Sequence, residues 1–171
     1  MCRKFLFSVL FFIAATTSWS SFAAASGGPF GLGVILGEPT GLTVKYDASA
    51  ETAYDAGLSF DLSRWILVYG DYQHKFGNII HGGPSAVLIP YIGVGGVLVV
   101  SNRSDYETRG YRYFDSGKSA SVALGVRVPF GIEWRPEDLP LDVFAEIAPG
   151  ITIIPGTYVF AQGGIGARYF F

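Results

Sequence analysis

The clearest feature of this sequence is an alternation of bulky apolar residues with small or polar ones, at a period of two. From residue 122 to 134 the even positions are Val, Leu, Val, Val, Phe, Ile and Trp, and the odd positions are Ala, Gly, Arg, Pro, Gly and Glu. Successive side chains of a β-strand point to opposite faces. The pattern therefore predicts a strand with one bulky apolar face and one small face that carries charges.

Similar alternation predicts five more strands, at residues 30–36, 42–47, 54–62, 141–151 and 159–171. Two other segments, 65–74 and 88–100, alternate less cleanly; in the first, Asp71 and Gln73 indicate that the odd positions form the polar face. Together the segments predict eight strands, with lengths near the roughly 9–11 residues that a tilted membrane-crossing strand needs.

The N-terminus has the organisation of an export signal. Arg3 and Lys4 precede an apolar run at residues 5–15, and small residues at Ala23 and Ala25 fit the cleavage rule of signal peptidase. The run is shorter than the roughly 20 residues of a spanning helix, which disfavours the alternative of a membrane anchor. We expect residues 1–25 to be a signal peptide cleaved after Ala25, and residues 26–171 to form one domain.

Composition narrows the class of this domain. Half of all residues are hydrophobic and only 15% are charged, yet the longest apolar stretch after the leader, 88–100, is interrupted by Pro90 and three glycines. An apolar chain without a spanning helix satisfies its backbone in lipid only as a closed barrel. Cys2 leaves with the leader, which excludes a disulfide framework or a thiolate site in the domain. The remaining ten basic and 14 acidic residues give no indication of nucleic-acid binding.

The face that carries Gly, Ala and Ser decides between two kinds of barrel. A water-soluble barrel would place the bulky face inside, and its outer face should then be rich in Lys, Glu, Thr and Gln. Glycine weakens a strand, and a solvated outer face gains nothing from it. The narrow interior of an eight-stranded barrel does need small residues. We therefore expect the bulky face to point outward to lipid, with the soluble ligand-binding barrel as the alternative.

The end of the chain adds a resemblance. Its last residues, Arg168-Tyr169-Phe170-Phe171, resemble the terminal strand of bacterial outer-membrane proteins, which the barrel-assembly machinery recognises. The layout of residues 30–171 is similar to small barrels of the OmpA transmembrane-domain and OmpX type. It also resembles small exported barrels with a Gly-Glu-Pro-Thr-Gly turn, here 37–41, and the stretches Arg-Pro-x-Asp-Leu-Pro-Leu and Glu-Ile-Ala-Pro, here 135–141 and 146–149. The resemblance implies an eight-stranded antiparallel up-and-down transmembrane β-barrel in the outer membrane, and it implies no catalytic residues.

The predicted parity sends charged residues into the interior. An isolated buried ion is very costly, so these charges must pair or stay hydrated. We predict a structural ion-pair network; a proton or cation path through surplus carboxylates is the alternative. The core of the network is Lys45, Asp61, Arg127, Glu133, Glu146 and Arg168, with Asp47, Asp55, Asp71 and Asp142 as further carboxylates.

The long connection between the fifth and sixth predicted strands, 101–121, is the candidate for partner binding. If both termini are periplasmic, an even number of strands places this connection outside the cell. Tyrosine and arginine often carry binding energy at interfaces. The candidate contact residues are Tyr106, Arg109, Tyr111, Arg112 and Tyr113.

Catalytic and cofactor signals are weak. His74 and His81 are the only histidines, and neither lies in the His-x-Ser arrangement of lipid A deacylases. His81 falls in a predicted turn, metal-ligand spacing is absent, and no cofactor is expected. The sequence favours a non-enzymatic barrel with a structural or surface-contact role. A lipid-modifying enzyme and a small ion channel are the alternatives.

Overall fold

The computed structural model describes residues 27–61, 65–77, 80–81, 86–101 and 122–171. The predicted signal peptide lies outside these residues. Within them, no helix is long and apolar enough to cross a membrane. The regular elements are ten β-strands: β1 (Phe30–Glu38), β2 (Gly41–Asp47), β3 (Thr52–Asp61), β4 (Trp65–Lys75), β5 (Ile80–His81), β6 (Ala86–Ser101), β7 (Val122–Arg127), β8 (Phe130–Pro136), β9 (Leu141–Ile154) and β10 (Tyr158–Phe170).

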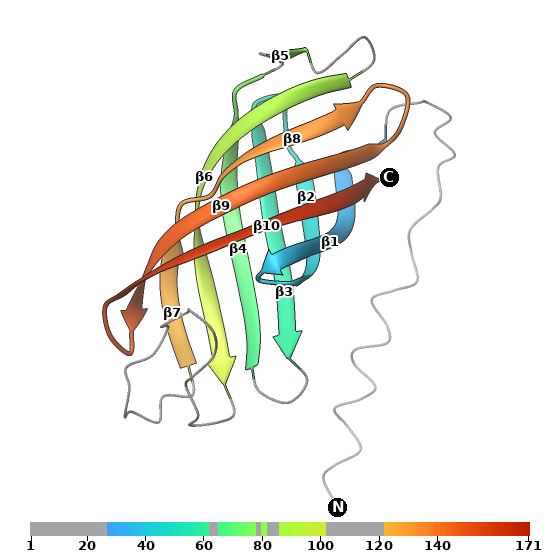
Figure 1. Cartoon of the computed structure of the whole chain (residues 1–171). Helices are drawn as coiled ribbons and strands as arrows, with labels where there is room; N and C mark the ends of the chain where they lie inside the picture. The colour runs from blue at the N-terminus through green and yellow to red at the C-terminus, as the bar shows by residue number, and fades with distance from the viewer. Residues whose placement is uncertain (1–26, 62–64, 78–79, 82–85, 102–121) are drawn as a thin grey trace, which may run out of the picture.

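The strands form one antiparallel sheet that closes on itself (Figure 1). Strands β1 to β4 pair in order, β4 pairs with β6, and β9 pairs with β10. Strand β10 pairs in turn with β1, from Gly31 opposite Phe170 to Glu38 opposite Gly163, and this completes the ring. Nine strands form this path, and β5 adds a two-residue pairing to β6. The fold is therefore all-β and closed.

The predicted strand at 122–134 is divided into β7 and β8, which both lie between β6 and β9. The break falls at Val128 and Pro129, and proline has no backbone N–H to give to a ladder. The chain stays in place there because Gly93 N donates to Pro129 O at 2.8 Å and Val128 N donates to Pro149 O at 2.9 Å. The turn predicted at His81 is also wrong, because its backbone pairs with Val87 in β5.

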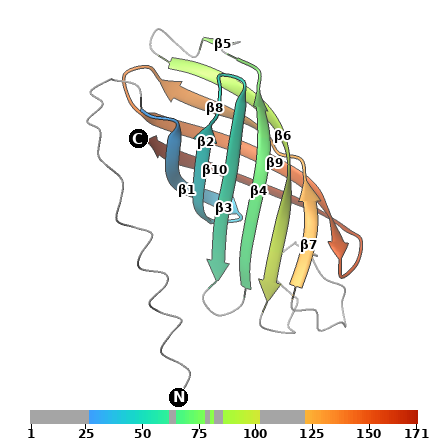
Figure 2. The ribbon, with the colours of Figure 1, turned by 180° about the vertical axis from the view of Figure 1, so that it is seen from behind.

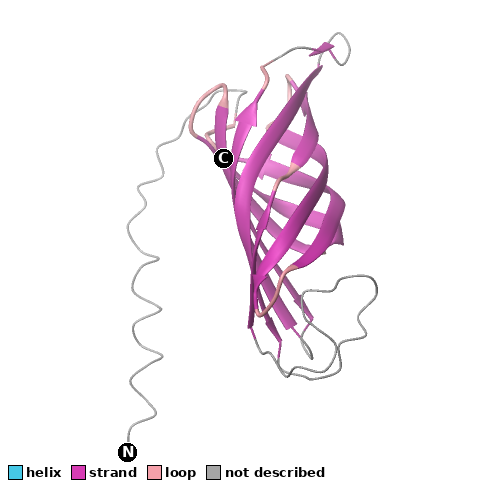
Figure 3. Cartoon of the chain, turned by 90° about the vertical axis from the view of Figure 1, so that its left-hand side faces the viewer, coloured by secondary structure: helices cyan, strands magenta, loops and turns pink. Residues whose placement is uncertain are grey.

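The paired residues show a large stagger around the ring. Following direct partners from Gly33 of β1 through each neighbouring strand leads to Tyr158 on β10. Gly33 itself pairs with Arg168, ten residues further along β10. Such a stagger tilts the strands against the ring axis, as closed sheets require. The tilt is visible in Figures 1 and 3.

The two ends of the ring differ in what they carry. The start of β1 and the end of β10 lie at the same end, together with the turn between β8 and β9 (Figure 2). We call this the termini end. The last residue of β6 and the first of β7, which flank the predicted 101–121 connection, lie at the opposite end. That connection therefore joins the ring at the end away from the termini.

Side-chain exposure alternates along the strands as the period of two predicts. In β9, positions 141, 143, 145 and 147 are exposed, whereas 142, 144, 146 and 148 are buried. Across the described residues the exposed positions are largely aliphatic and aromatic, and the buried ones include most of the charged residues. This distribution is the reverse of the one in water-soluble proteins.

Closure between β1 and β10 can be tested by cross-linking. Leu32 and Tyr169 are direct partners across this seam and both point outward. We expect Leu32→Cys and Tyr169→Cys, in a chain that also carries Cys2→Ser, to form a disulfide under mild oxidation, because paired strand positions lie within disulfide range. Electrophoresis without reductant should show a shifted monomer band. The pair Leu32→Cys and Ile165→Cys is displaced along the seam and should not cross-link; equal cross-linking of both pairs would contradict the register.

Candidate functional site: the charged interior and its mouth

The interior of the ring holds most of the predicted network. Lys45, Arg127, Glu133, Glu146 and Arg168 are all buried there. Asp61 is the last residue of β3, and its side chain lies outside the described part of the chain. The further predicted carboxylates Asp55, Asp71 and Asp142 are buried in the same interior, and Asp47 is partly exposed at the termini end.

Lys45 lies at the centre of one group. Its ammonium pairs with the carboxylate of Glu133 on β8, and both side chains are fully buried. It also donates to Gln73 Oε1 on β4 at 2.8 Å. Strands β2, β4 and β8 are not neighbours in the ring, so these contacts run across the interior.

Arg168 joins three further strands. Its guanidinium pairs with Asp55 of β3 and lies 3.4 Å from Asp142 of β9. It also donates to the hydroxyl of Thr43 on β2, at 3.1 Å from Nη2. Gln73 donates to Asp55 Oδ2 at 3.2 Å, which links this group to Lys45.

Arg127 organises the group nearest the middle of the ring. Its Nη2 pairs with Glu146 and lies 3.1 Å from Asp71 Oδ2, and its Nη1 donates to Gln162. The hydroxyl of Tyr91 donates to the other oxygen of Glu146 at 2.7 Å. One cation thus serves two buried carboxylates.

Two basic residues outside the predicted network complete it at the termini end. Asp47 is shared between Lys75 at 2.8 Å and Arg135 at 2.6 Å. Arg135 also lies 2.9 Å from Glu133, so the end and the centre are connected. The alternation itself could have found both residues, because Lys75 follows Gln73 by two positions and Arg135 follows Glu133 by two.

Opposite charges are nearly balanced among the described interior side chains. Five cations face six carboxylates, and each of these charged groups has at least one oppositely charged neighbour within 4 Å. Buried charges are tolerated when they are paired and hydrogen-bonded. The arrangement can hold a closed interior together, and it offers no described group of three or more His, Cys, Asp or Glu side chains suited to a metal ion.

Four of the five cations share one packing arrangement. Each lies over an aromatic ring, and that ring covers a glycine directly opposite it on the neighbouring strand. A Cβ on any of these glycines would lie within 2.8 Å of the ring. The stacks are Gly166–Phe144–Arg168, Gly57–Tyr69–Arg127, Gly31–Phe170–Arg135 and Gly131–Tyr91–Lys45, with cation-to-centroid distances of 3.7, 4.2, 4.7 and 5.0 Å.

The interior becomes apolar toward the end opposite the termini. Tyr69, whose ring lies below Arg127, belongs to a buried apolar cluster contributed by β4, β6, β7 and β10. Charged groups therefore fill one part of the interior and apolar side chains the other. The cluster consists of Leu67, Tyr69, Val97, Val99, Ala123 and Phe160.

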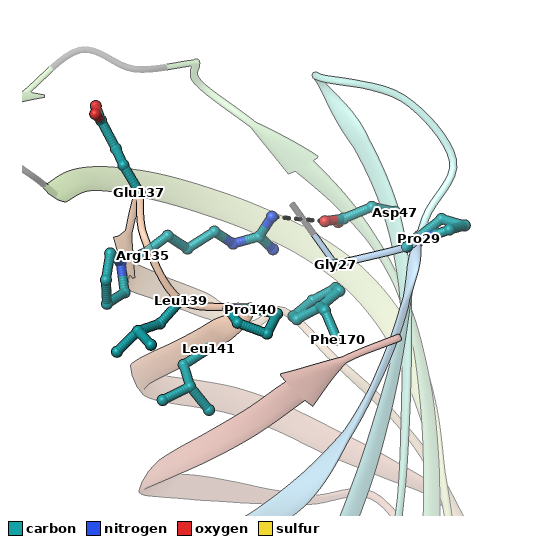
Figure 4. Close-up of a pocket in the computed structure, with 11 residues that line it drawn as sticks. Gly27, Pro29, Asp47, Arg135, Glu137, Leu139, Pro140, Leu141 and Phe170 are labelled. Atoms are coloured by element: carbon teal, nitrogen blue, oxygen red, sulfur yellow. Dashed lines mark hydrogen bonds and ion pairs between the residues drawn. The ribbon is translucent and has the colours of Figure 1, made fainter. Parts of the chain in front are cut away.

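The termini end contains a pocket of about 340 Å³ (Figure 4), which we call the mouth pocket. The ion pair of Arg135 and Asp47 crosses it, and the ring of Phe170 lies below the guanidinium. Its remaining walls are mostly apolar. The lining residues are Gly27, Gly28, Pro29, Asp47, Arg135, Pro136, Glu137, Leu139, Pro140, Leu141 and Phe170.

The remaining predicted sites fall elsewhere. The candidate contact residues Tyr106, Arg109, Tyr111, Arg112 and Tyr113 lie outside the described residues. His74 is on the outward-facing side of β4 and packs edge-on against Phe76, with ring centroids 5.3 Å apart. It is not part of the interior network.

Comparisons of the chain with protein-family models, with curated proteins and with solved structures found no match.

The glycine stacks predict a sharp difference between two alanine substitutions. Gly57→Ala places a Cβ 2.3 Å from the ring of Tyr69, and we expect it to lower the free energy of unfolding by about 1–3 kcal/mol, as overpacking does. The control is Gly70→Ala on the outward face, where nothing lies within 4 Å, and which should be neutral or stabilising by about 0.5–1 kcal/mol. Urea unfolding in detergent or lipid measures both, and equal effects would contradict the stacking.

The network also predicts an asymmetry between the two partners of its central pair. Glu133→Gln removes the carboxylate that serves both Lys45 and Arg135, and we expect a loss of about 3–5 kcal/mol because a buried ammonium is left uncompensated. Lys45→Met should be milder, since Glu133 keeps Arg135 at 2.9 Å. The same unfolding measurement decides this, and a Lys45→Met variant as unstable as Glu133→Gln would show that Arg135 does not compensate Glu133.

Proposed function

We propose that this chain is an integral β-barrel of the bacterial outer membrane, with a filled interior and a structural or surface-contact role. The observation that carries the proposal is the inverted distribution of side chains. A closed ring buries charged residues and exposes large apolar ones on strand after strand. Exposed apolar area of this extent is stable only when something apolar covers it, and a bilayer does so around the whole ring.

A band of exposed aromatic side chains supports the same location. Phe30 packs against Tyr46 and Phe171, with ring centroids 5.7 and 6.2 Å apart, and Tyr54 packs against Tyr72 at 5.9 Å. Trp134 and Tyr169 extend the band along β8 and β10. All these residues lie in the part of the ring near the termini end. Membrane barrels carry such girdles where the hydrocarbon meets the headgroups.

Backbone closure supports a transmembrane rather than a surface-bound arrangement. In hydrocarbon every N–H and C=O needs a partner, and the β1–β10 seam supplies the partners that an open edge would lack. We count β7 and β8 as one strand interrupted at Pro129, which gives the eight-stranded up-and-down barrel of the OmpA transmembrane-domain and OmpX type. The leader 1–25 and the terminal Phe171 fit export and recognition by the barrel-assembly machinery.

The filled interior favours a structural role over conduction. Ion pairs join β2 to β8 and β10 to β3 across the ring, and the apolar cluster follows toward the opposite end. Eight strands leave room only for side chains. A small cation or proton path is the second candidate, and the surplus carboxylate beside Arg127 is the observation that favours it.

A water-soluble barrel and a lipid-modifying enzyme have less support. A water-soluble ligand-binding barrel requires a polar outer face, and the exposed face here is apolar. A lipid-modifying enzyme requires catalytic groups gathered at one end, whereas the outward-facing His74 packs on Phe76. Surface contact is assigned to the 101–121 connection because its flanking residues lie at the end away from the termini.

Membrane fractionation with a heat-modifiability gel tests the proposal. We expect the protein in the outer-membrane fraction, with a folded band that shifts on boiling because a closed β-barrel resists detergent at room temperature. In planar bilayers the purified protein should give no sustained conductance, because its interior is filled. A soluble periplasmic protein with no band shift would overturn the membrane location, and a steady cation-selective conductance would replace the structural role with the channel.

A further inference from the structure

The mouth pocket carries a charge that the interior network does not use. Asp47 is shared between Lys75 and Arg135, and Arg135 is also near Glu133 at 2.9 Å and Asp142 at 3.7 Å. Glu137, in contrast, makes no ion pair with the described residues and is exposed at the edge of the pocket (Figure 4). The lining therefore has one carboxylate more than it has cations. A cationic group suits this pocket better than an anion, because the guanidinium is already surrounded by carboxylates.

The walls of the pocket lead onto the outward face of the ring. Leu139 is 53% exposed in the turn between β8 and β9, and Leu141 is 36% exposed at the start of β9. Leu141 pairs directly with the outward-facing Tyr169 of the aromatic band. A molecule whose apolar part lies along this face can place a polar end in the pocket. The shape thus combines a charged recess with an apolar approach from the side.

We propose that the mouth pocket binds the primary ammonium headgroup of an aminophospholipid from the membrane leaflet at the termini end. This inference rests on the proposed membrane location. The ammonium lies between the carboxylates of Glu137 and Asp47, the phosphodiester stays at the edge, and the acyl chains follow Leu141 and Tyr169. A volume of about 340 Å³ accommodates the headgroup and leaves the chains outside.

Three lipids that differ in the headgroup separate this proposal from general lipid adhesion. Phosphatidylethanolamine has a primary ammonium with three N–H donors, phosphatidylcholine has a bulkier ammonium without donors, and phosphatidylglycerol has no cation. The full-length exported protein, purified in detergent, is mixed with each lipid and analysed by native mass spectrometry. We expect phosphatidylethanolamine to be retained about fivefold more than phosphatidylglycerol, the factor that a partly exposed ion pair supplies.

Glu137→Gln and Asp138→Asn form a matched pair of variants. They are adjacent carboxylates in the same turn, but only Glu137 lines the pocket. Glu137→Gln should reduce phosphatidylethanolamine retention to the level of phosphatidylglycerol, and Asp138→Asn should leave it unchanged. Both variants should keep the heat-dependent band shift, since neither residue takes part in an ion pair of the described interior.

Several outcomes would overturn the inference. Equal retention of phosphatidylethanolamine and phosphatidylglycerol, or an unaffected Glu137→Gln variant, would show that the pocket does not recognise an ammonium. Displacement of the lipid by millimolar phosphoethanolamine would show that a free amine, and not a membrane lipid, is the ligand. A protein that shifts on boiling but shows no headgroup preference removes this inference alone, whereas a protein without the shift removes the proposed function as well.

Discussion

The space inside a narrow closed ring is the constraint on which the rest of this structure depends. Inward-pointing side chains from facing strands meet at the axis, so each large residue needs a small one beside it. The inward glycines meet this need: Gly166, Gly57, Gly131 and Gly31 each lie beneath an aromatic ring of the next strand. Those rings then support Arg168, Arg127, Lys45 and Arg135. Glycine, which weakens a strand by itself, here makes room for the charges of the interior.

Electrostatics follows from this packing. A cation held on an aromatic face has few alternative positions, so its carboxylate partners must come to it from other strands. Lys45 and Glu133 meet from β2 and β8, and Arg168 meets Asp55 from β3. Such pairs connect strands that share no backbone hydrogen bonds, and they add to the ladder that closes the ring. Removing one partner leaves an uncompensated buried charge, which makes the interior a fixed element of the fold.

The two ends of the interior have different chemistry, and this difference relates the fold to the proposed function. Toward the termini end the ion pairs reach the mouth pocket, where Arg135 and Asp47 are 21% and 15% exposed. Toward the other end the interior closes with an apolar cluster. A path for ions would have to cross both parts. The outward apolar band and the aromatic residues near the termini fit a bilayer around the ring, and the mouth pocket opens where that bilayer would end.

The sequence by itself determined which side chains share a face. A period of two needs only local geometry, so the alternation located the interior positions of Lys45, Arg127 and Arg168 and predicted the strands of the ring. It also predicted that the interior charges must pair. It predicted neither Lys75 nor Arg135 as members, although both continue the parity of strands whose predicted ends were set too early.

Only the tertiary structure decided which groups meet. Lys45 and Glu133 are 88 residues apart in the sequence, and their contact depends on the stagger with which the ring closes. The same stagger places Gly57 opposite Tyr69 and Gly166 opposite Phe144, which no local pattern specifies. The division of one predicted strand at Pro129 and the mouth pocket arise in the same way, because each depends on segments brought side by side by closure. Periodicity fixes the direction of a side chain, whereas its partner is fixed by the register of the whole ring.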